Sequence, residues 1–283
     1  NSSTCTTVVT VNDNTNPTIT CPADVTSAKT SDDGTGNCTS TVSLGTPTAF
    51  DFCAIQSVIA SIGGTVIDPA TYLFPTGTTT VTWTATDVSG LTASCTQNVT
   101  LVDDEKPTFT VPANTSVCRA TDGTYNIGLA VTGDVTDEAD NCSTGIIASY
   151  SDNLTGLVNN YTAGTVIRTW TLSDVAGNVT TKTQSIVVNP TPIISNITTS
   201  SCNGSSFSVT PANGTDGVVP SGTTYSWNAP TVTGGLTGGA SGSDASSISG
   251  TLTNTTTAPQ TATYTVTPVT GTCTGNSFKV TVT

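Results

Sequence analysis

The sequence has no histidine and no methionine, and only six of its 283 residues are lysine or arginine. Without histidine, nucleophile–base pairs of the Ser–His and Cys–His type are excluded. Six scattered basic residues cannot form the clustered positive surface that binds nucleic-acid phosphates. The 19 acidic residues bring the net charge to −13, so divalent cations are the natural counter-charge.

Charged residues of both signs make up only 9% of the chain, and no run combines helical spacing with cap signals. Threonine and valine are abundant, are stiff at χ1 and fit pleated strands. No apolar stretch approaches 18 residues, so we expect no membrane insertion of this segment. The composition predicts an all-β protein, and its length suits two or three domains.

Nine cysteines indicate an oxidising, extracellular compartment. No Cys-x-x-Cys spacing occurs, so the pattern does not indicate a zinc site. No signal peptide is visible either, which predicts a mature chain or an internal piece of a longer one. We therefore expect structural disulfides in a secreted protein.

Two units of the chain repeat the same order of signals. Residues 16–22 correspond to residues 106–112, and residues 82–90 correspond to residues 169–177. Each unit also contains an Asp-Gly pair, which is a strong hairpin signal. Each closes with a Trp-containing strand, an Asp-x-x-Gly turn and a final strand. About seven short strands at this spacing predict tandem immunoglobulin-like β-sandwiches arranged end to end.

The repeats also predict the domain boundaries. Residues 5–13 match residues 95–103, the last strand of the first unit. Residues 1–13 are therefore expected to be the last strand of an upstream repeat. The predicted β-sandwiches lie at residues 14–103, 104–190 and 191–283.

The cysteine positions predict a disulfide pattern. The second unit has Val111 and Lys182 where the first has Cys21 and Cys95, and two positions lost together suggest one lost bridge. Pairing within units leaves Cys5 to bond with a cysteine of the upstream repeat. The predicted disulfides are Cys21–Cys95, Cys38–Cys53, Cys118–Cys142 and Cys202–Cys273.

Three motifs carry a family resemblance in the first two units. They are residues 17–22, residues 51–53 and the Phe-Pro-x-Gly-Thr-Thr-x-Val run that begins at Phe74. On these residues the two units resemble hyalin repeat (HYR) domains. The second unit departs from the pattern by lacking two of the cysteines.

The third unit has different motifs, at residues 202–211, 225–230 and 264–268. With these it resembles the PKD-like repeats of Bacteroidota surface proteins. Together the resemblances imply a very large cell-surface adhesin, exported by the type IX route and of the kind used in gliding motility.

Acidic residues suggest one ligand site. In an immunoglobulin-like sandwich the B–C and F–G loops lie at one end, near the entering chain. Asp51 and Asp87 fall in these loops of the first unit, and Asp13 precedes it. Such clusters suit calcium, although solvated turn acids with Asx-type bonds are the alternative interpretation. The candidate calcium ligands, at this joint and the next, are Asp13, Asp51, Asp87, Asp103, Asp104, Glu105, Asp137, Asp140 and Asp174.

The three tryptophans have two interpretations. Trp83 and Trp170 occupy the same slot in two units, which favours core packing over a sugar-stacking platform. The same interpretation extends to Trp227. Paired carboxylates exist, but no cleft can be argued around them, so no catalytic residue is predicted.

Three functions fit these observations. The first is a non-catalytic structural and adhesive stalk, whose partners are neighbouring repeats of the same polypeptide and surface glycans or a substratum. The second is a carbohydrate-binding module of a secreted enzyme, which requires exposed, co-planar aromatic side chains. The third is a subunit of an extracellular filament that self-assembles by strand exchange.

Overall fold

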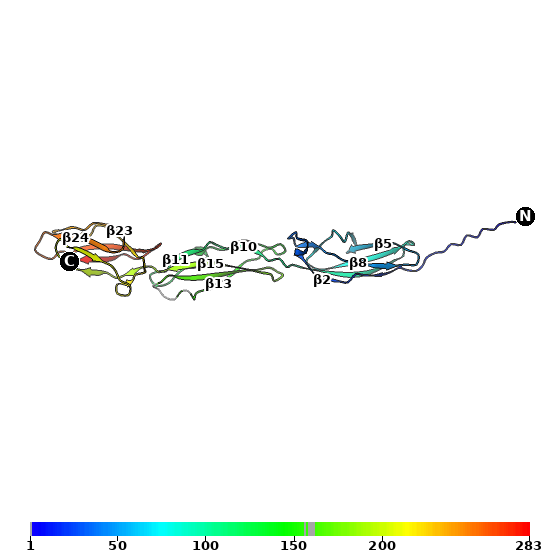
Figure 1. The fold of residues 1–283 in the computed structure, drawn as a ribbon, viewed down its shortest axis with the longest axis horizontal. Helices are drawn as coiled ribbons and strands as arrows, with labels where there is room; N and C mark the ends of the chain where they lie inside the picture. Colours follow the sequence, from blue (N-terminus) through cyan, green and yellow to red (C-terminus); the bar gives the residue numbers. More distant parts are fainter. Residues whose placement is uncertain (1, 156, 158–161) are drawn as a thin grey trace. The chain divides into compact units, whose positions relative to one another are not determined.

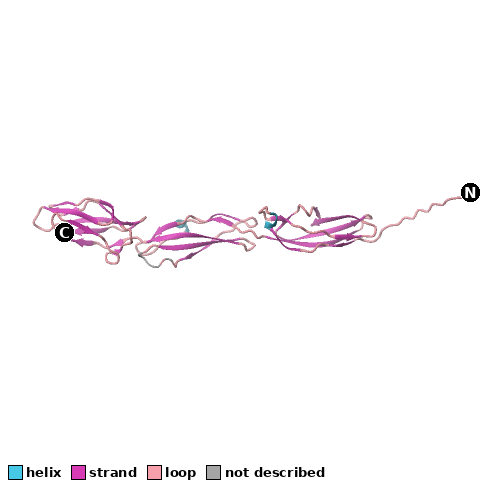
Figure 2. Ribbon diagram, in the orientation of Figure 1, coloured by secondary structure: helices cyan, strands magenta, loops and turns pink. Residues whose placement is uncertain are grey.

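The computed structural model describes residues 2–155, 157 and 162–283. Strands account for 48% of the chain and helices for 3%, which confirms the all-β prediction. In these ranges the helical segments are the single turns η1 (Thr30–Asp33) and α1 (Leu129–Thr132) (Figure 2). No helix among the described residues has the length and hydropathy needed to cross a bilayer.

The first sandwich pairs a five-stranded sheet, in the order β2-β9-β8-β5-β6, with two small sheets, β1-β4 and β3-β7 (Figure 1). Phe74 on β7 and Val81 on β8 are completely buried in one shared core. Alternating apolar residues along β8 face this core, as a half-buried strand requires. The strands are β1 (Thr18–Thr20), β2 (Val25–Lys29), β3 (Thr39–Thr41), β4 (Thr48–Phe50), β5 (Ile55–Ile62), β6 (Thr65–Ile67), β7 (Leu73–Pro75), β8 (Gly77–Asp87) and β9 (Thr92–Val102).

The middle sandwich has a four-stranded sheet, β11-β15-β14-β13, and a two-stranded sheet, β10-β12. Val166, Ile186 and Val188 are completely buried at its centre. Its strands are β10 (Thr108–Thr110), β11 (Thr115–Cys118), β12 (Thr136–Ala139), β13 (Ser149–Asn153), β14 (Gly164–Ser173) and β15 (Val179–Asn189).

The third sandwich is built from a seven-stranded sheet with the main order β17-β27-β25-β20-β23, a three-stranded sheet β18-β24-β22 and the pair β16-β19. Strands β21 and β26 pair with β25. Tyr264 and Ile248 are fully buried between the layers. The strands are β16 (Ile193–Ile194), β17 (Ile197–Thr199), β18 (Ser206–Val209), β19 (Gly217–Val218), β20 (Thr224–Trp227), β21 (Thr231–Val232), β22 (Leu236–Gly238), β23 (Gly242–Ala245), β24 (Ile248–Asn254), β25 (Ala262–Thr270), β26 (Cys273–Thr274) and β27 (Phe278–Val282).

One topological feature recurs in all three sandwiches. An early strand pairs in parallel with the last strand: β2 with β9, β11 with β15, and β17 with β27. Parallel neighbours run in the same direction, so the chain enters each sandwich at one end and leaves it at the other.

A buried glutamine supports the first and middle sandwiches in the same way. Gln97 donates its amide to two backbone carbonyls, those of Ala23 (2.7 Å) and Leu44 (2.9 Å). Gln184 does the same in the middle sandwich, toward Ala113 (3.0 Å) and Thr132 (2.8 Å). Each glutamine follows its tryptophan by the same interval in sequence, so the two sandwiches share an internal scaffold.

The disulfide pattern corrects three of the four predicted pairs. The structure joins Cys21 to Cys95, the pair expected in the first sandwich. The predicted pairs Cys38–Cys53, Cys118–Cys142 and Cys202–Cys273 are not formed. The structure instead joins Cys38 to Cys142 and Cys118 to Cys273.

The reason for the error is that the two cysteines of each predicted pair lie at opposite ends of one sandwich. Cys53 lies at the entry of the first sandwich, near Asp13, whereas Cys38 lies at the exit, where Asn37 contacts Asn141. In the third sandwich, Cys202 lies near the final residue of the chain. Cys5, Cys53 and Cys202 are exposed free thiols within the described part of the chain.

Residues 2–17 form no strand. Val8, Val9 and Val11 of this segment are 78–87% exposed. The predicted last strand of an upstream repeat is therefore extended chain with unburied valines here, and Asn1 lies outside the described residues.

The chain divides into two compact units that cut through the middle sandwich. The first unit comprises Asn1–Phe109, which includes the first sandwich and the start of β10, together with the segments Asp137–Ala148 and Leu172–Thr180 of the middle sandwich. The second unit contains the rest of the middle sandwich and the third sandwich. Two loops of the middle sandwich therefore pack with the first sandwich, and this arrangement positions the site described next.

Candidate metal centre

Three carboxylates distant in sequence meet in the first compact unit. Asp103 follows β9, Asp140 follows β12 and Asp174 follows β14. One oxygen from each lies within 4.8 Å of the corresponding oxygens of the other two. The local strand ends determine this meeting, because each acid is the first residue after its strand.

Backbone amides hold two of these carboxylates in place. Asp140 accepts bonds from the amides of Cys142 (3.0 Å) and Ser143 (2.7 Å) through a single oxygen, Oδ2. Asp174 accepts from the amide of Asn178 at 2.7 Å and from the side chain of the same residue at 2.8 Å. These turn bonds fix the carboxylates without neutralising their charge.

Several oxygens at this cluster are buried without a hydrogen-bond partner. They are Oδ2 of Asp103, Oδ1 of Asp140 and Oδ1 of Asn141. Asp103 is only 6% exposed. Burying a polar atom without a partner costs about 1–3 kcal/mol, and more when the group is charged.

The electrostatics at Asp103 are unfavourable in the absence of a cation. Burial raises the pKa of Asp103, and the neighbouring carboxylates of Asp140 and Asp174 raise it further. An opposite charge placed among the three oxygens would counteract both causes, because it favours the ionised carboxylate.

The other acids predicted at this joint point elsewhere. Asp104 forms an ion pair with Lys29 (3.2 Å) and accepts a bond from the hydroxyl of Ser31 (3.0 Å). Glu105 accepts a hydrogen bond from the side-chain amide of Asn141. Asp137 is exposed and lies outside the cluster of three oxygens.

A second cluster lies at the entry of the first sandwich. Asp13, Asp51 and Cys53 bring one ligand atom each within 4.8 Å of one another. Hydrogen bonding to Asp13 and its charge raise the pKa of the Cys53 thiol, and the charge of Asp87 contributes to the same shift. Asp87 is completely buried, and its Oδ2 has no partner.

Family models match two parts of the sequence. A model described as HYR domain matches residues 12–101, and one described as PKD-like domain matches residues 211–283. The chain carries an HYR domain followed by a PKD-like domain.

Solved structures resemble the chain weakly. Mouse Cadherin-23 EC22–24 is 17% identical, with 95% of this chain and 99% of that chain covered and a TM-score of 0.35. Human CDH23 EC21–23 is 12% identical, with 95% and 100% covered and a TM-score of 0.39. The Protocadherin GammaB4 extracellular domain is 14% identical with a TM-score of 0.37, and this chain covers half of its length. No curated protein matches the sequence.

The sequence analysis missed two asparagines that position residues around this cluster. Asn178 donates its side-chain amide to the carbonyl of Asp103 (3.1 Å) and to Oδ2 of Asp174 (2.8 Å), and Asn141 donates its side-chain amide to the carboxylate of Glu105. A signal was present, because Asn141 directly follows Asp140 in the B–C loop and Asn178 closes the F–G turn.

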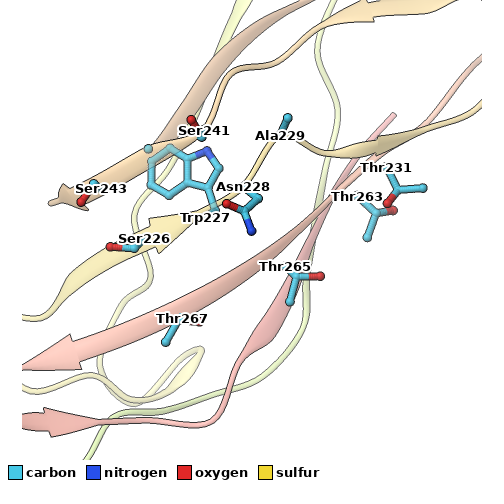
Figure 3. A pocket seen from close by; sticks show the side chains of 11 residues that line it. Ser226, Trp227, Asn228, Ala229, Thr231, Ser241, Ser243, Thr263, Thr265 and Thr267 are labelled. Atoms are coloured by element: carbon cyan, nitrogen blue, oxygen red, sulfur yellow. The ribbon is translucent and has the colours of Figure 1, made fainter.

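The PKD-like domain contains an open cavity of about 760 Å³ (Figure 3). Trp227 is only 7% exposed there, and its indole N–H donates to the carbonyl of Ala240 at 3.0 Å. The ring is therefore a wall of the cavity and offers no free stacking face. The lining residues are Ser226, Trp227, Asn228, Ala229, Thr231, Ser241, Gly242, Ser243, Thr263, Thr265 and Thr267.

Proposed function

We propose that this chain is a non-catalytic structural segment of a large extracellular adhesive repeat protein, in which successive modules are covalently joined. On this view the modules hold an adhesive surface away from the cell. The observation that carries the proposal is the pair of disulfides that link one module to the next.

Each of these disulfides joins parts of different modules. Cys38 of the HYR domain bonds to Cys142, in a loop of the middle sandwich. Cys118 of the middle sandwich bonds to Cys273 of the PKD-like domain. A bond of this kind keeps neighbouring modules attached even if one of them unfolds or is cleaved, which suits a protein exposed to proteases and pulling.

The free thiols extend the same pattern to neighbouring repeats. Cys53 occupies the slot in the HYR domain that Cys142 occupies in the middle sandwich, so it would bond to the module before it. Cys5 corresponds to Cys95 and would bond to a cysteine of that same upstream module. Phe52, next to Cys53, is 91% exposed and is available for contact there.

Further elements of the proposal rest on the family resemblance. They are a role in gliding motility, export by the type IX route and attachment to surface glycans or a substratum. Calcium is the proposed cofactor at the joints between modules. The carbohydrate-binding alternative receives less support, since Trp83, Trp170 and Trp227 are at most 7% exposed.

The native polypeptide tests this function. Mass spectrometry under denaturing and reducing conditions is expected to give a mass far above the 28.4 kDa of these residues. A native mass near 28.4 kDa, with assembly into fibres, would instead support a filament subunit.

A non-reducing peptide map tests the covalent joints separately. It is expected to contain the Cys38–Cys142 and Cys118–Cys273 linked peptides. A map with Cys38 bonded to Cys53 would remove the observation on which the proposal depends.

A further inference from the structure

We propose that Asp103, Asp140 and Asp174 bind one calcium ion between the HYR domain and the two loops of the middle sandwich that pack with it. This deepens the proposed function by naming the ligands that would hold the ion at one joint. Binding of calcium is measurable in the isolated chain, whatever the length of the native protein.

The spacing of the oxygens fits a single ion. Calcium binds protein oxygens at about 2.3–2.6 Å, so two ligands of the same ion can lie up to about 5 Å apart. The three carboxylate oxygens lie within 4.8 Å of one another. The observed separations therefore allow one ion to reach all three.

The unpartnered oxygens indicate a binding site for a cation. Oδ2 of Asp103 and Oδ1 of Asp140 are buried and accept no hydrogen bond. The other oxygen of each carboxylate accepts backbone amides, from Glu105 at 3.3 Å in one case and from Cys142 at 3.0 Å in the other. One oxygen of each acid is thus anchored and the second remains for a ligand.

Within the described ranges, neither the ion pair of Lys29 with Asp104 nor that of Arg168 with Asp152 involves a carboxylate of this cluster. None of the three clustered carboxylates has a lysine or arginine partner in that part of the chain. A divalent ion would offset their mutual repulsion.

The chemistry of the ligands favours calcium over magnesium. The available donors are carboxylate oxygens of three aspartates. They come from separate loops, an irregular arrangement that calcium accepts and that the strict octahedron of magnesium does not. The Cys38–Cys142 disulfide holds the Asp140 loop against the HYR domain, so it supports the ligand geometry.

The entry cluster of the HYR domain repeats this scaffold. The carboxylates of Asp13 and Asp103 each accept the amide two residues later, at 3.0 and 3.3 Å. Those of Asp87 and Asp174 each accept the amide four residues later, at 2.9 and 2.7 Å.

Oδ2 of Asp13 and Oδ2 of Asp87 are again buried without partners. Phe52 stands where the other cluster has Asn141, and Leu91 stands where it has Asn178. The entry cluster therefore brings together two carboxylates, of Asp13 and Asp51, and the soft thiol of Cys53, so it should bind calcium more weakly.

Calcium titration of the calcium-free 283-residue chain tests the inference. Isothermal calorimetry is expected to show one tighter and one weaker site. Asp103→Asn should weaken the tighter site at least tenfold, whereas Asp122→Asn, in an exposed turn away from both clusters, should leave it unchanged. Equal affinities in Asp103→Asn and the parent chain would overturn the assignment.

Thermal unfolding distinguishes a calcium-binding role of Asp103 from a purely structural one. With a chelator present, Asp103→Asn should melt at or above the temperature of the parent chain, because it removes repulsion. With calcium the order should reverse. Failure of calcium to raise the melting temperature of the parent chain would overturn the proposal, and an equal rise with magnesium would overturn the choice of ion.

Discussion

Equivalent positions in the first and middle sandwiches hold different stabilising groups. The first has the disulfide Cys21–Cys95 and the buried Val81. The middle one has Val111 and Lys182 in the disulfide slots, and it has Arg168 in the slot of Val81.

Arg168 is only 1% exposed and forms an ion pair with Asp152 at 2.7 Å. It also donates to the hydroxyl of Thr132 (2.8 Å) and the carbonyl of Ile127 (2.7 Å). The guanidinium lies 4.2 Å from the ring centroid of Tyr150. The Asp152 carboxylate raises the pKa of Arg168.

The comparison shows that the same sandwich fold can be stabilised either by a disulfide or by a buried ion pair. A disulfide acts mainly by restricting the unfolded chain. A buried ion pair instead depends on complete hydrogen bonding, and the loss of one partner leaves an uncompensated buried charge that destabilises the fold. The two sandwiches should therefore respond differently to substitution.

The largest effect is expected for Arg168→Met, which leaves the carboxylate of Asp152 without its cationic partner. We expect a loss of about 3–5 kcal/mol in the free energy of unfolding of the middle sandwich. Urea unfolding followed by hydrogen exchange of the β14 amides measures this loss. The double variant Arg168→Met/Asp152→Leu should recover most of it.

A matched control is Lys29→Met, which breaks an exposed ion pair whose lysine is 55% exposed. It should cost about 1 kcal/mol or less, because solvent screens such pairs. A similar cost for Arg168→Met and Lys29→Met would show that the buried pair is not the main stabilising group of the middle sandwich.

The next effect is expected for Cys21→Ser combined with Cys95→Ser. Removing this disulfide should destabilise the first sandwich by about 2–4 kcal/mol, because the unfolded chain gains freedom. Hydrogen exchange of β8 and β9 measures the change, with β14 as the internal reference. Equal destabilisation of β14 would contradict the separate stabilisation of the two sandwiches.

The smallest effect distinguishes the two buried glutamines. Gln97→Leu and Gln184→Leu should each cost about 1–3 kcal/mol, because two backbone carbonyls lose their donor. Gln97→Leu should cost more, since Oε1 of Gln97 also accepts the indole N–H of Trp83 at 3.1 Å. A larger cost for Gln184→Leu, measured by the same exchange experiment, would reverse this ranking.

The sequence predicts the fold class well because strand periodicity and turn residues are local signals. The prediction of Cys21–Cys95 was right, and the other three pairs failed because pairing within each unit was assumed, although Cys38 and Cys142 come from different modules. Connectivity depends on which end of a sandwich a residue occupies, and local sequence does not reveal this.

The acid cluster has a similar lesson. Repetition of the same slots indicated that Asp103, Asp140 and Asp174 lie near one another, as the structure shows. The repeats could not show which of the neighbours Asp103 and Asp104 belongs to the cluster. Successive side chains of an extended chain point to opposite sides, so only one of the two can face it. Asp104 therefore faces Lys29 while Asp103 faces the other two acids.

The parallel pairing of an early and the last strand has a mechanical consequence. In the HYR domain β2 lies beside β9, and their register runs from Val25 with Val99 to Lys29 with Val102. Tension applied through the two ends of the domain draws these strands in opposite directions along their length. The hydrogen bonds between the two strands are then loaded in shear, so they must break together and not one after another.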